Sequence, residues 1–241
     1  MSAPFLVKIC GLSTPASIDA AVDAGADMIG LVHFARSPRH VDADAAARLA
    51  DHARGRAAVV LLTVDADDAL LDALVARIRP DVVQLHGRED VARVAAVRAR
   101  TRLKVAKALG IASADDVDRA RDHDRGSADY LLFDAKPPKD ATRPGGLGAP
   151  FDWDLLAGAA FATPVLLSGG LGPTNVGEAV RRTRPAGVDV SSGVESAPGV
   201  KDDAKIRAFV AAARAAAAEI APPEDAARGA ADASTRQTRQ R

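Results

Sequence analysis

The chain has 241 residues but only one cysteine, and aromatic residues make up just 3% of it. The single thiol, Cys10, excludes an intrachain disulfide and any zinc site built from several cysteines. The scarcity of aromatic rings argues against a surface on which nucleobases stack. We therefore expect neither a disulfide scaffold nor a nucleic-acid-binding protein.

Net charge and long apolar segments are also missing. The 32 Lys and Arg residues cancel 32 Asp and Glu residues, so no overall field favours nucleic acid or an anionic membrane. Apolar runs such as residues 57–62 are too short to span a bilayer, and the first residues do not follow the pattern of a signal peptide. The sequence predicts a cytoplasmic protein with no membrane partner.

Short apolar runs alternate with helical segments along most of the chain. Apolar runs bounded by turn residues predict buried parallel strands, and Ala-rich stretches with helical spacing predict helices between them. The expected strands are residues 5–10, 28–33, 57–64, 81–86, 103–108, 130–134, 164–168 and 187–191. The expected helices are residues 14–24, 42–52, 67–78, 90–100, 113–125, 173–184 and 201–220.

This alternation predicts an α/β protein with one parallel sheet and right-handed crossovers. Eight repeats in this length favour a single (β/α)8 TIM barrel over an open doubly wound sheet, which is the alternative. We expect the barrel domain to occupy residues 1–221 and the polar residues 222–241 to form a disordered tail. Residues 135–150, rich in Pro and Gly, predict an active-site loop or a disordered insertion.

Two glycine- and serine-rich strand ends are the strongest chemical signal. Gly169 and Gly170 follow the seventh expected strand, and Ser191, Ser192 and Gly193 end the eighth. Exposed backbone N–H groups near a helix start bind anions, and loops seven and eight of such barrels often hold phosphate. The pattern favours a phosphorylated small-molecule ligand, although these glycines also suit tight turns alone.

Two further strand ends carry groups that transfer protons. Cys10 ends the first strand, with Lys8 on the same side, but a lone cysteine also serves as a small buried hydrophobe. Asp134 ends the sixth strand after an apolar run, where a carboxylate is costly unless it has a function or a partner such as Lys136 or a backbone group. In a ring of eight strands, Cys10 and Asp134 can face one substrate from opposite sides as base and acid.

Two basic side chains complete the set of candidates. Arg39 offers a fork suited to a carboxylate or phosphate, although an Arg in a polar loop is usually a surface residue. His86 can donate a proton, bind a ligand or play a structural role. No other His, Asp or Glu lies at metal-ligand spacing from it, so we expect no metal site.

Taken together, these strand ends resemble phosphoribosylanthranilate isomerase, a barrel enzyme of tryptophan biosynthesis. The matching pieces run in order over most of the chain. They are VKICGL (7–12), GADMIGLV (25–32), SPRHV (37–41), VQLHG (83–87), LLFDAK (131–136), GGLGAPFDW (145–153), LSGGL (167–171) and VDVSSGVES (188–196).

The resemblance implies a cofactor-free Amadori rearrangement of a phosphorylated substrate. Cys10 matches the family's general base, Asp134 its general acid, and Arg39 the residue that holds the anthranilate carboxylate. Asp189 matches a position in the pocket, and we place His86 with it among the substrate-binding residues. The phosphate would lie on the two glycine- and serine-rich loops. The protein would act as a monomer or a homodimer.

Some positions depart from the family pattern, and other functions stay open. His33 and Leu147 replace residue types more usual in the family, and the third strand ends LLTVDADD rather than in a Phe-Val-Asn-like sequence. Another phosphosugar barrel is an alternative, such as indole-glycerol-phosphate synthase or ribulose-phosphate epimerase. So is a barrel that only binds a phosphorylated metabolite, which would need neither Cys10 nor Asp134.

Overall fold

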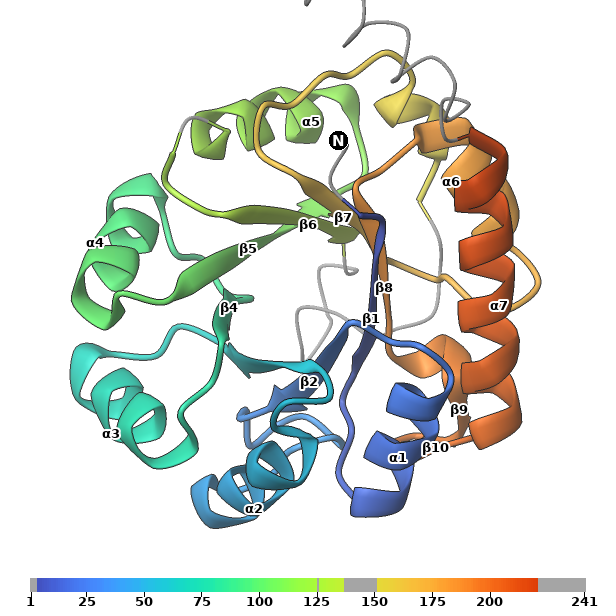
Figure 1. Ribbon diagram of the computed structural model, residues 1–241. Coiled ribbons are helices and arrows are strands. Elements are labelled where there is room, and N and C mark those ends of the chain that lie inside the picture. The colour runs from blue at the N-terminus through green and yellow to red at the C-terminus, as the bar shows by residue number, and fades with distance from the viewer. Residues whose placement is uncertain (1–3, 125, 137–150, 221–241) are drawn as a thin grey trace, which may run out of the picture.

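The computed structural model describes residues 4–124, 126–136 and 151–220. Eight parallel strands close into a barrel in chain order, because β1 pairs with both β2 and β8. Helices surround the strands on the outside (Figure 1). The expected TIM barrel is therefore confirmed, and the open sheet is excluded. The predicted tail at 222–241 and most of the predicted loop at 135–150 lie outside the described residues.

The elements follow the predicted order. The barrel strands are β1 (Leu6–Cys10), β2 (Met28–Val32), β3 (Ala58–Thr63), β4 (Val82–Leu85), β5 (Lys104–Ile111), β6 (Tyr130–Ala135), β7 (Val165–Leu167) and β8 (Gly187–Val190). The α-helices are α1 (Pro15–Asp23), α2 (Ala43–Ala53), α3 (Asp68–Ile78), α4 (Val91–Thr101), α5 (Ala114–Ala120), α6 (Val176–Thr183) and α7 (Asp203–Ile220). Short 3-10 helices are η1 (Arg121–His123), η2 (Trp153–Leu156) and η3 (Ser192–Val194).

Polar residues at the helix starts explain why the helices begin where the sequence predicts. The side chains of Asp42, Asp67 and Asp90 each accept a hydrogen bond from the backbone N–H three residues later. Thr14 and Ser113 do the same at the starts of α1 and α5. Such caps satisfy N–H groups that have no partner inside the helix.

Two helix starts were predicted too early. The helix expected from residue 173 begins at Val176, because the Asn175 side chain bonds to Gly170 and Gly172 and holds the preceding residues in a turn. The helix expected from residue 201 begins at Asp203, because Lys201 belongs to a two-stranded sheet of β9 (Glu195–Ala197) and β10 (Val200–Lys201). This hairpin was not predicted.

The apolar residues form a core on both sides of the barrel wall. Inside the barrel, Met28, Val60, Val82 and Ala106 pack together. Outward-facing strand residues pack against the apolar faces of the helices in one large cluster. The apolar residues thus fill the middle of the barrel. Inward-facing polar groups lie near the carboxyl ends of the strands.

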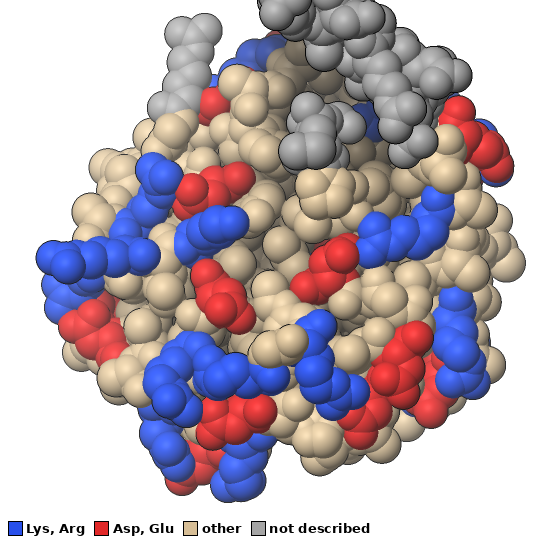
Figure 2. Space-filling view, viewed as in Figure 1, with Lys and Arg blue, Asp and Glu red and all other residues tan. Residues whose placement is uncertain are grey.

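No helix in the described residues is long and apolar enough to cross a membrane. On the face that Figure 2 shows, basic and acidic side chains are interspersed rather than gathered into areas of one sign. The protein also has many exposed ion pairs, such as Arg77 with Asp44 and Arg100 with Asp72. The zero net charge is therefore also balanced locally over this face.

Candidate active site

The candidate residues lie at one end of the barrel. Cys10 and Asp134 are at the carboxyl ends of β1 and β6, and His86 directly follows β4. Because all eight strands are parallel, these strand ends share one rim with the loops after β7 and β8. The structure thus brings the predicted groups to the end where barrel enzymes carry their active sites.

Cys10 points into the barrel at this rim. Its side chain packs with Val32 and Leu62, and the residue is only 4% exposed. A Cβ on Gly30 would lie 2.8 Å from the Cys10 sulfur, so the neighbouring strand must have glycine at that position. The thiol is therefore confined on its apolar side, and its reactivity depends on the charged groups on the other side.

A buried ion pair lies below the thiol. Lys8 Nζ donates to Asp189 Oδ1 at 2.7 Å, and both side chains are almost fully buried. Asp189 Oδ2 also accepts from the Ser168 hydroxyl at 3.3 Å. Burial alone would lower the pKa of Lys8, but the charges of Asp189 and of the Cys10 thiolate outweigh it and raise that pKa. Lys8 therefore stays cationic beside Cys10.

The same environment sets the acidity of Cys10. Burial raises the pKa of the thiol, while the positive charges of Lys8 and Lys201 oppose this effect only in part. A thiol serves as a base only if its own pKa is lowered or the substrate proton is acidic. Because the thiol pKa is raised, the thiol is not activated by its surroundings, and the substrate proton itself has to be acidic.

Titration of the thiol tests this balance directly, because Cys10 is the only cysteine in the chain. We expect the ultraviolet absorbance of the thiolate to develop with a midpoint above the ordinary pKa of cysteine. Lys8→Met should move the midpoint higher still, since it removes the nearest opposing positive charge. Cys10→Ser is the blank that subtracts the contribution of Tyr130. A midpoint below the ordinary value would contradict the dominance of burial.

Asp134 faces His86 across the rim. His86 Nε2 lies 3.4 Å from Asp134 Oδ2, and the other carboxylate oxygen accepts from the backbone N–H of Ala135 at 2.8 Å. Lys136, considered as a partner for Asp134, instead donates to Asp116 at 2.7 Å. The Asp134 carboxylate is thus oriented by a local backbone contact and His86, and within residues 4–124, 126–136 and 151–220 no Lys or Arg forms an ion pair with it.

Gln84 contacts His86, and a second buried ion pair holds the backbone of Gly87, the next residue. Neither feature was predicted from the sequence. Gln84 lies inside the barrel with its side-chain amide nitrogen 3.1 Å from His86 Nδ1. Lys107 Nζ donates to Glu89 and to the backbone carbonyl of Gly87, each at 2.7 Å. With Nδ1 facing the Gln84 amide, Nε2 is the ring nitrogen turned toward Asp134.

The two glycine- and serine-rich loops meet. Gly169 and Gly170 both have positive φ, and a Cβ on Gly169 would lie 2.4 Å from the Ala135 nitrogen. A Cβ on Gly193 would lie 1.9 Å from the backbone oxygen of Leu171. Glycine at 169 and 193 is therefore required for the loops after β6, β7 and β8 to pack together. Their tight-turn role is confirmed, and phosphate binding remains a prediction.

Arg39 is buried, unlike a typical loop arginine. Its Nε and Nη2 donate to the two carboxylate oxygens of Glu195 at 2.6 and 2.7 Å. Glu195 also accepts from Lys201 Nζ at 2.8 Å. The sequence analysis did not single out Glu195 or Lys201. The only local signal was a glutamate in a run of small and apolar residues.

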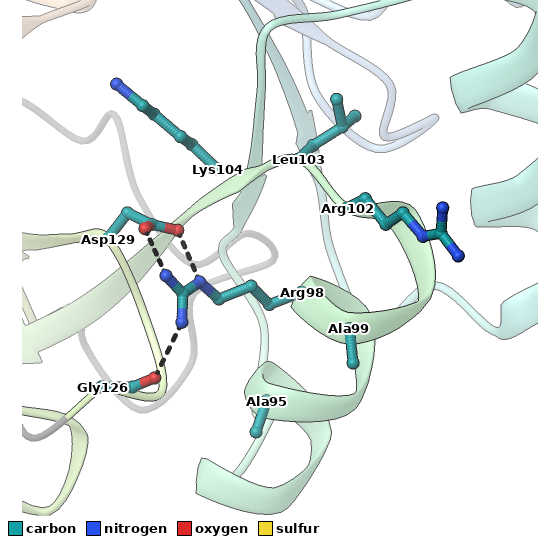
Figure 3. A pocket seen from close by; sticks show the side chains of 8 residues that line it. All are labelled: Ala95, Arg98, Ala99, Arg102, Leu103, Lys104, Gly126 and Asp129. Carbon is teal, nitrogen blue, oxygen red and sulfur yellow. Dashed lines mark hydrogen bonds and ion pairs between the residues drawn. The ribbon is translucent and has the colours of Figure 1, made fainter.

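A second hollow lies at the opposite end of the barrel, near the start of β5 (Figure 3). It has a volume of about 470 Å³ and is lined by α4 and the start of β5. Its Arg98 is already held by both oxygens of Asp129 at 3.0 and 2.8 Å and by the Gly126 carbonyl. That guanidinium is therefore already paired, whereas Arg102 and Lys104 line the same hollow without an ion pair among the described residues. No group of three or more potential metal ligands occurs within the described ranges.

Comparison with known proteins places this arrangement in a family. A family model described as "N-(5'phosphoribosyl)anthranilate (PRA) isomerase" matches residues 7–212. A protein named N-(5'-phosphoribosyl)anthranilate isomerase from Rhodopseudomonas palustris (strain BisA53) is 60% identical over 212 residues. That match covers 88% of this chain and 97% of the relative.

Solved structures agree with the sequence relatives. Monomers generated from the dimeric phosphoribosylanthranilate isomerase of Thermotoga maritima match with a TM-score of 0.76 and 30% identity, over 88% of this chain and 99% of theirs. A phosphoribosyl anthranilate isomerase in complex with reduced 1-(o-carboxyphenylamino)-1-deoxyribulose 5-phosphate matches with a TM-score of 0.73 and 29% identity. This match also covers 88% of this chain and 99% of the other chain.

Proposed function

Since the chain belongs to the family of N-(5'-phosphoribosyl)anthranilate isomerases, aldose–ketose isomerases of tryptophan biosynthesis, we propose how its own residues carry out the reaction. The substrate is N-(5-phospho-β-D-ribosyl)anthranilate and the product is 1-(2-carboxyphenylamino)-1-deoxy-D-ribulose 5-phosphate. The observation that carries the proposal is the placement of a thiol and a carboxyl on β1 and β6 at one rim.

Asp134 acts as the general acid in the first step. It gives a proton to the furanose ring oxygen while the bond between that oxygen and C1 breaks. The lone pair of the anthranilate nitrogen forms the C1–N double bond of an iminium ion. The contact of Asp134 with His86 Nε2 at 3.4 Å keeps the carboxyl turned toward the pocket.

Cys10 acts as the general base in the second step. Its thiolate removes the proton from C2, and the electron pair moves through C1 to the iminium nitrogen. The resulting enolamine tautomerises to the C2 ketone as C1 takes a proton. Because the iminium makes the C2 proton acidic, a thiol with a raised pKa still serves as the base. The atoms balance without a cofactor, as an isomerisation requires.

The remaining groups bind and orient the substrate. Arg39 receives the anthranilate carboxylate, and His86 lies beside the opening sugar. The phosphate rests on backbone N–H groups of Gly169, Gly170 and the Ser191–Gly193 segment, which the packing of the loops brings together. Asp189 acts through Lys8, which it holds at 2.7 Å below the thiol. All these residues come from one chain, so the chemistry is the same in a monomer or a homodimer.

A steady-state assay with phosphoribosylanthranilate and no added metal tests the proposal. We expect turnover by the unaltered chain that chelators do not change. A chain that binds the reduced product analogue but does not turn over the substrate would instead be a phosphometabolite-binding barrel. Turnover that requires an added divalent metal would contradict the cofactor-free scheme.

Arg39→Ala should weaken substrate binding more than it slows the chemistry. The substitution removes a charge-assisted fork, so we expect KM to rise by about tenfold to a hundredfold, with a smaller change in kcat. Loss of Arg39 also leaves Glu195 buried with Lys201 as its remaining cation, so the melting temperature must be measured in parallel. An unchanged KM in folded protein would remove the carboxylate-binding role.

A further inference from the structure

We propose that Glu195, held by Lys201, is a positioning residue that turns one edge of the Arg39 guanidinium toward the substrate carboxylate. This inference rests on the proposed function of Arg39. The Arg39 clasp, as we name Glu195, Gly199 and Lys201, belongs to the β9–β10 hairpin that follows β8. The hairpin lies at the rim beside the ends of β1 and β2. Cys10 is the last residue of β1, and Arg39 lies in the loop that follows β2.

The hydrogen bonds of Arg39 show which edge is used. Nε and Nη2 each donate one hydrogen to Glu195, at 2.6 and 2.7 Å. An arginine has five N–H donors, so Nη1 keeps two and Nη2 keeps one. Among the described residues, no acceptor lies within hydrogen-bond distance of Nη1. The Nη1–Nη2 edge therefore remains as a second fork, with the geometry that matches a carboxylate.

The stem of Arg39 is confined as tightly as its head. A Cβ on Gly11 would lie 2.4 Å from Arg39 Cδ, so the stem lies directly on the residue that follows Cys10. Gly199, at the turn of the hairpin, approaches Pro38 so closely that a Cβ would be 2.6 Å from the Pro38 oxygen. Its N–H also donates to Glu195 Oε2 at 3.2 Å. The hairpin thus contacts both the Arg39 side chain and the backbone of Pro38, the preceding residue.

Charge decides what the clasp can bind. Glu195 cancels one of the two positive charges of Arg39 and Lys201, so the cluster keeps one net positive charge in a buried place. Burial alone would raise the pKa of Glu195, but Arg39 and Lys201 outweigh it and lower that pKa, which keeps the carboxylate ionised. Lys201 also donates to the Ser191 backbone oxygen at 2.9 Å, which joins the clasp to the end of β8. An anionic substrate group is therefore the natural partner of the free edge.

The test compares two ligands that differ by one group. The first is the reduced product analogue with its aromatic carboxylate, and the second is the same compound with a plain phenyl ring. In Glu195→Gln we expect affinity for the first to fall by about tenfold or more, because one oriented hydrogen bond is lost. Affinity for the second should change little, and KM should rise more than kcat falls. In an Arg39→Ala background, Glu195→Gln should have no additional effect on this discrimination.

The matched control is Glu219→Gln. Glu219 holds Arg181 Nε and Nη2 at 2.6 and 3.2 Å in the same fork, but on the surface, where both side chains are about half exposed. This variant should keep both affinities. If Glu195→Gln does not fold, Lys201→Met tests the same clasp, because it removes one of the two donors to Glu195 Oε1 and leaves that oxygen with Arg39 Nε alone. It should reduce the same discrimination to a smaller extent.

The outcomes separate the two proposals. Two results in a clasp variant would overturn the positioning role of Glu195, namely an equal loss of affinity for both ligands or a loss for neither. The Arg39–Glu195 ion pair would then only link the hairpin to the barrel. Absence of turnover by the unaltered chain would overturn the proposed function instead. Selective loss for the carboxylate ligand alone would support the inference.

Discussion

Cys10→Ser is expected to lower kcat by about a hundredfold to ten-thousandfold, the usual contribution of a positioned general base. A serine hydroxyl has the same connectivity as the thiol but does not ionise in the range where a thiol does. The thiol touches mainly Val32 and Leu62 on its apolar side, so the smaller oxygen fits without displacing them. The melting temperature should therefore change far less than the rate.

The variant must still bind for this loss to indicate chemistry. We expect Cys10→Ser to bind the reduced product analogue with nearly unchanged affinity, because the proposed phosphate and carboxylate contacts lie elsewhere. With substrate deuterated at C2, its slowed proton removal should give a larger isotope effect than that of the unaltered protein. Turnover within about tenfold of the original value would remove Cys10 from the mechanism.

Asp134→Asn should cause a loss of similar size by a different route. The amide has nearly the same shape and its oxygen can still accept from the Ala135 N–H, but it has no acidic proton to give to the ring oxygen. We expect kcat to fall by about a hundredfold to ten-thousandfold. Because ring opening then limits the rate, the isotope effect from C2 deuteration should shrink. The two variants thus predict opposite isotope effects.

Asp116→Asn is the matched control for this substitution. Asp116 is also a buried carboxylate, and it pairs with Lys136 at 2.7 Å, but the proposed mechanism does not use it. The control should lose stability and keep its turnover in the folded protein. If Asp134→Asn retained activity, or if its isotope effect rose as in Cys10→Ser, the assignment of Asp134 as the acid would be wrong.

These predictions rest on residues that the sequence itself identifies. In a parallel strand every second side chain faces the same way, so the ends of apolar runs show which groups reach the rim. This rule makes Cys10 and Asp134 candidates, and the resemblance to the family implies their roles as base and acid. The loop glycines are candidates from their place after β7 and β8. The predicted strand boundaries agree with the structure to within a few residues, because turn and cap residues are local signals.

Other features depend on neighbours that no local pattern reveals. The pKa of Cys10 is raised by burial and by Asp189 on β8, against the opposing charges of Lys8 on β1 and Lys201 on β10. The hairpin of β9 and β10 was not predicted, and residue 201 was assigned to a helix, because two short strands with a tight turn carry little periodicity. Gln84 looks like an ordinary polar residue in a strand until His86 is seen beside it.

The sequence by itself therefore determined the barrel, because periodicity is a property of neighbouring residues. Its motifs indicated the family, and that resemblance implied which residues carry the proposed proton transfers. Only the tertiary structure decided how those residues are held. Arg39 and Glu195 are 156 residues apart in the chain, and Lys8 and Asp189 are 181 apart. Closure of the barrel brings these pairs to within 3 Å, where burial strengthens each charge interaction.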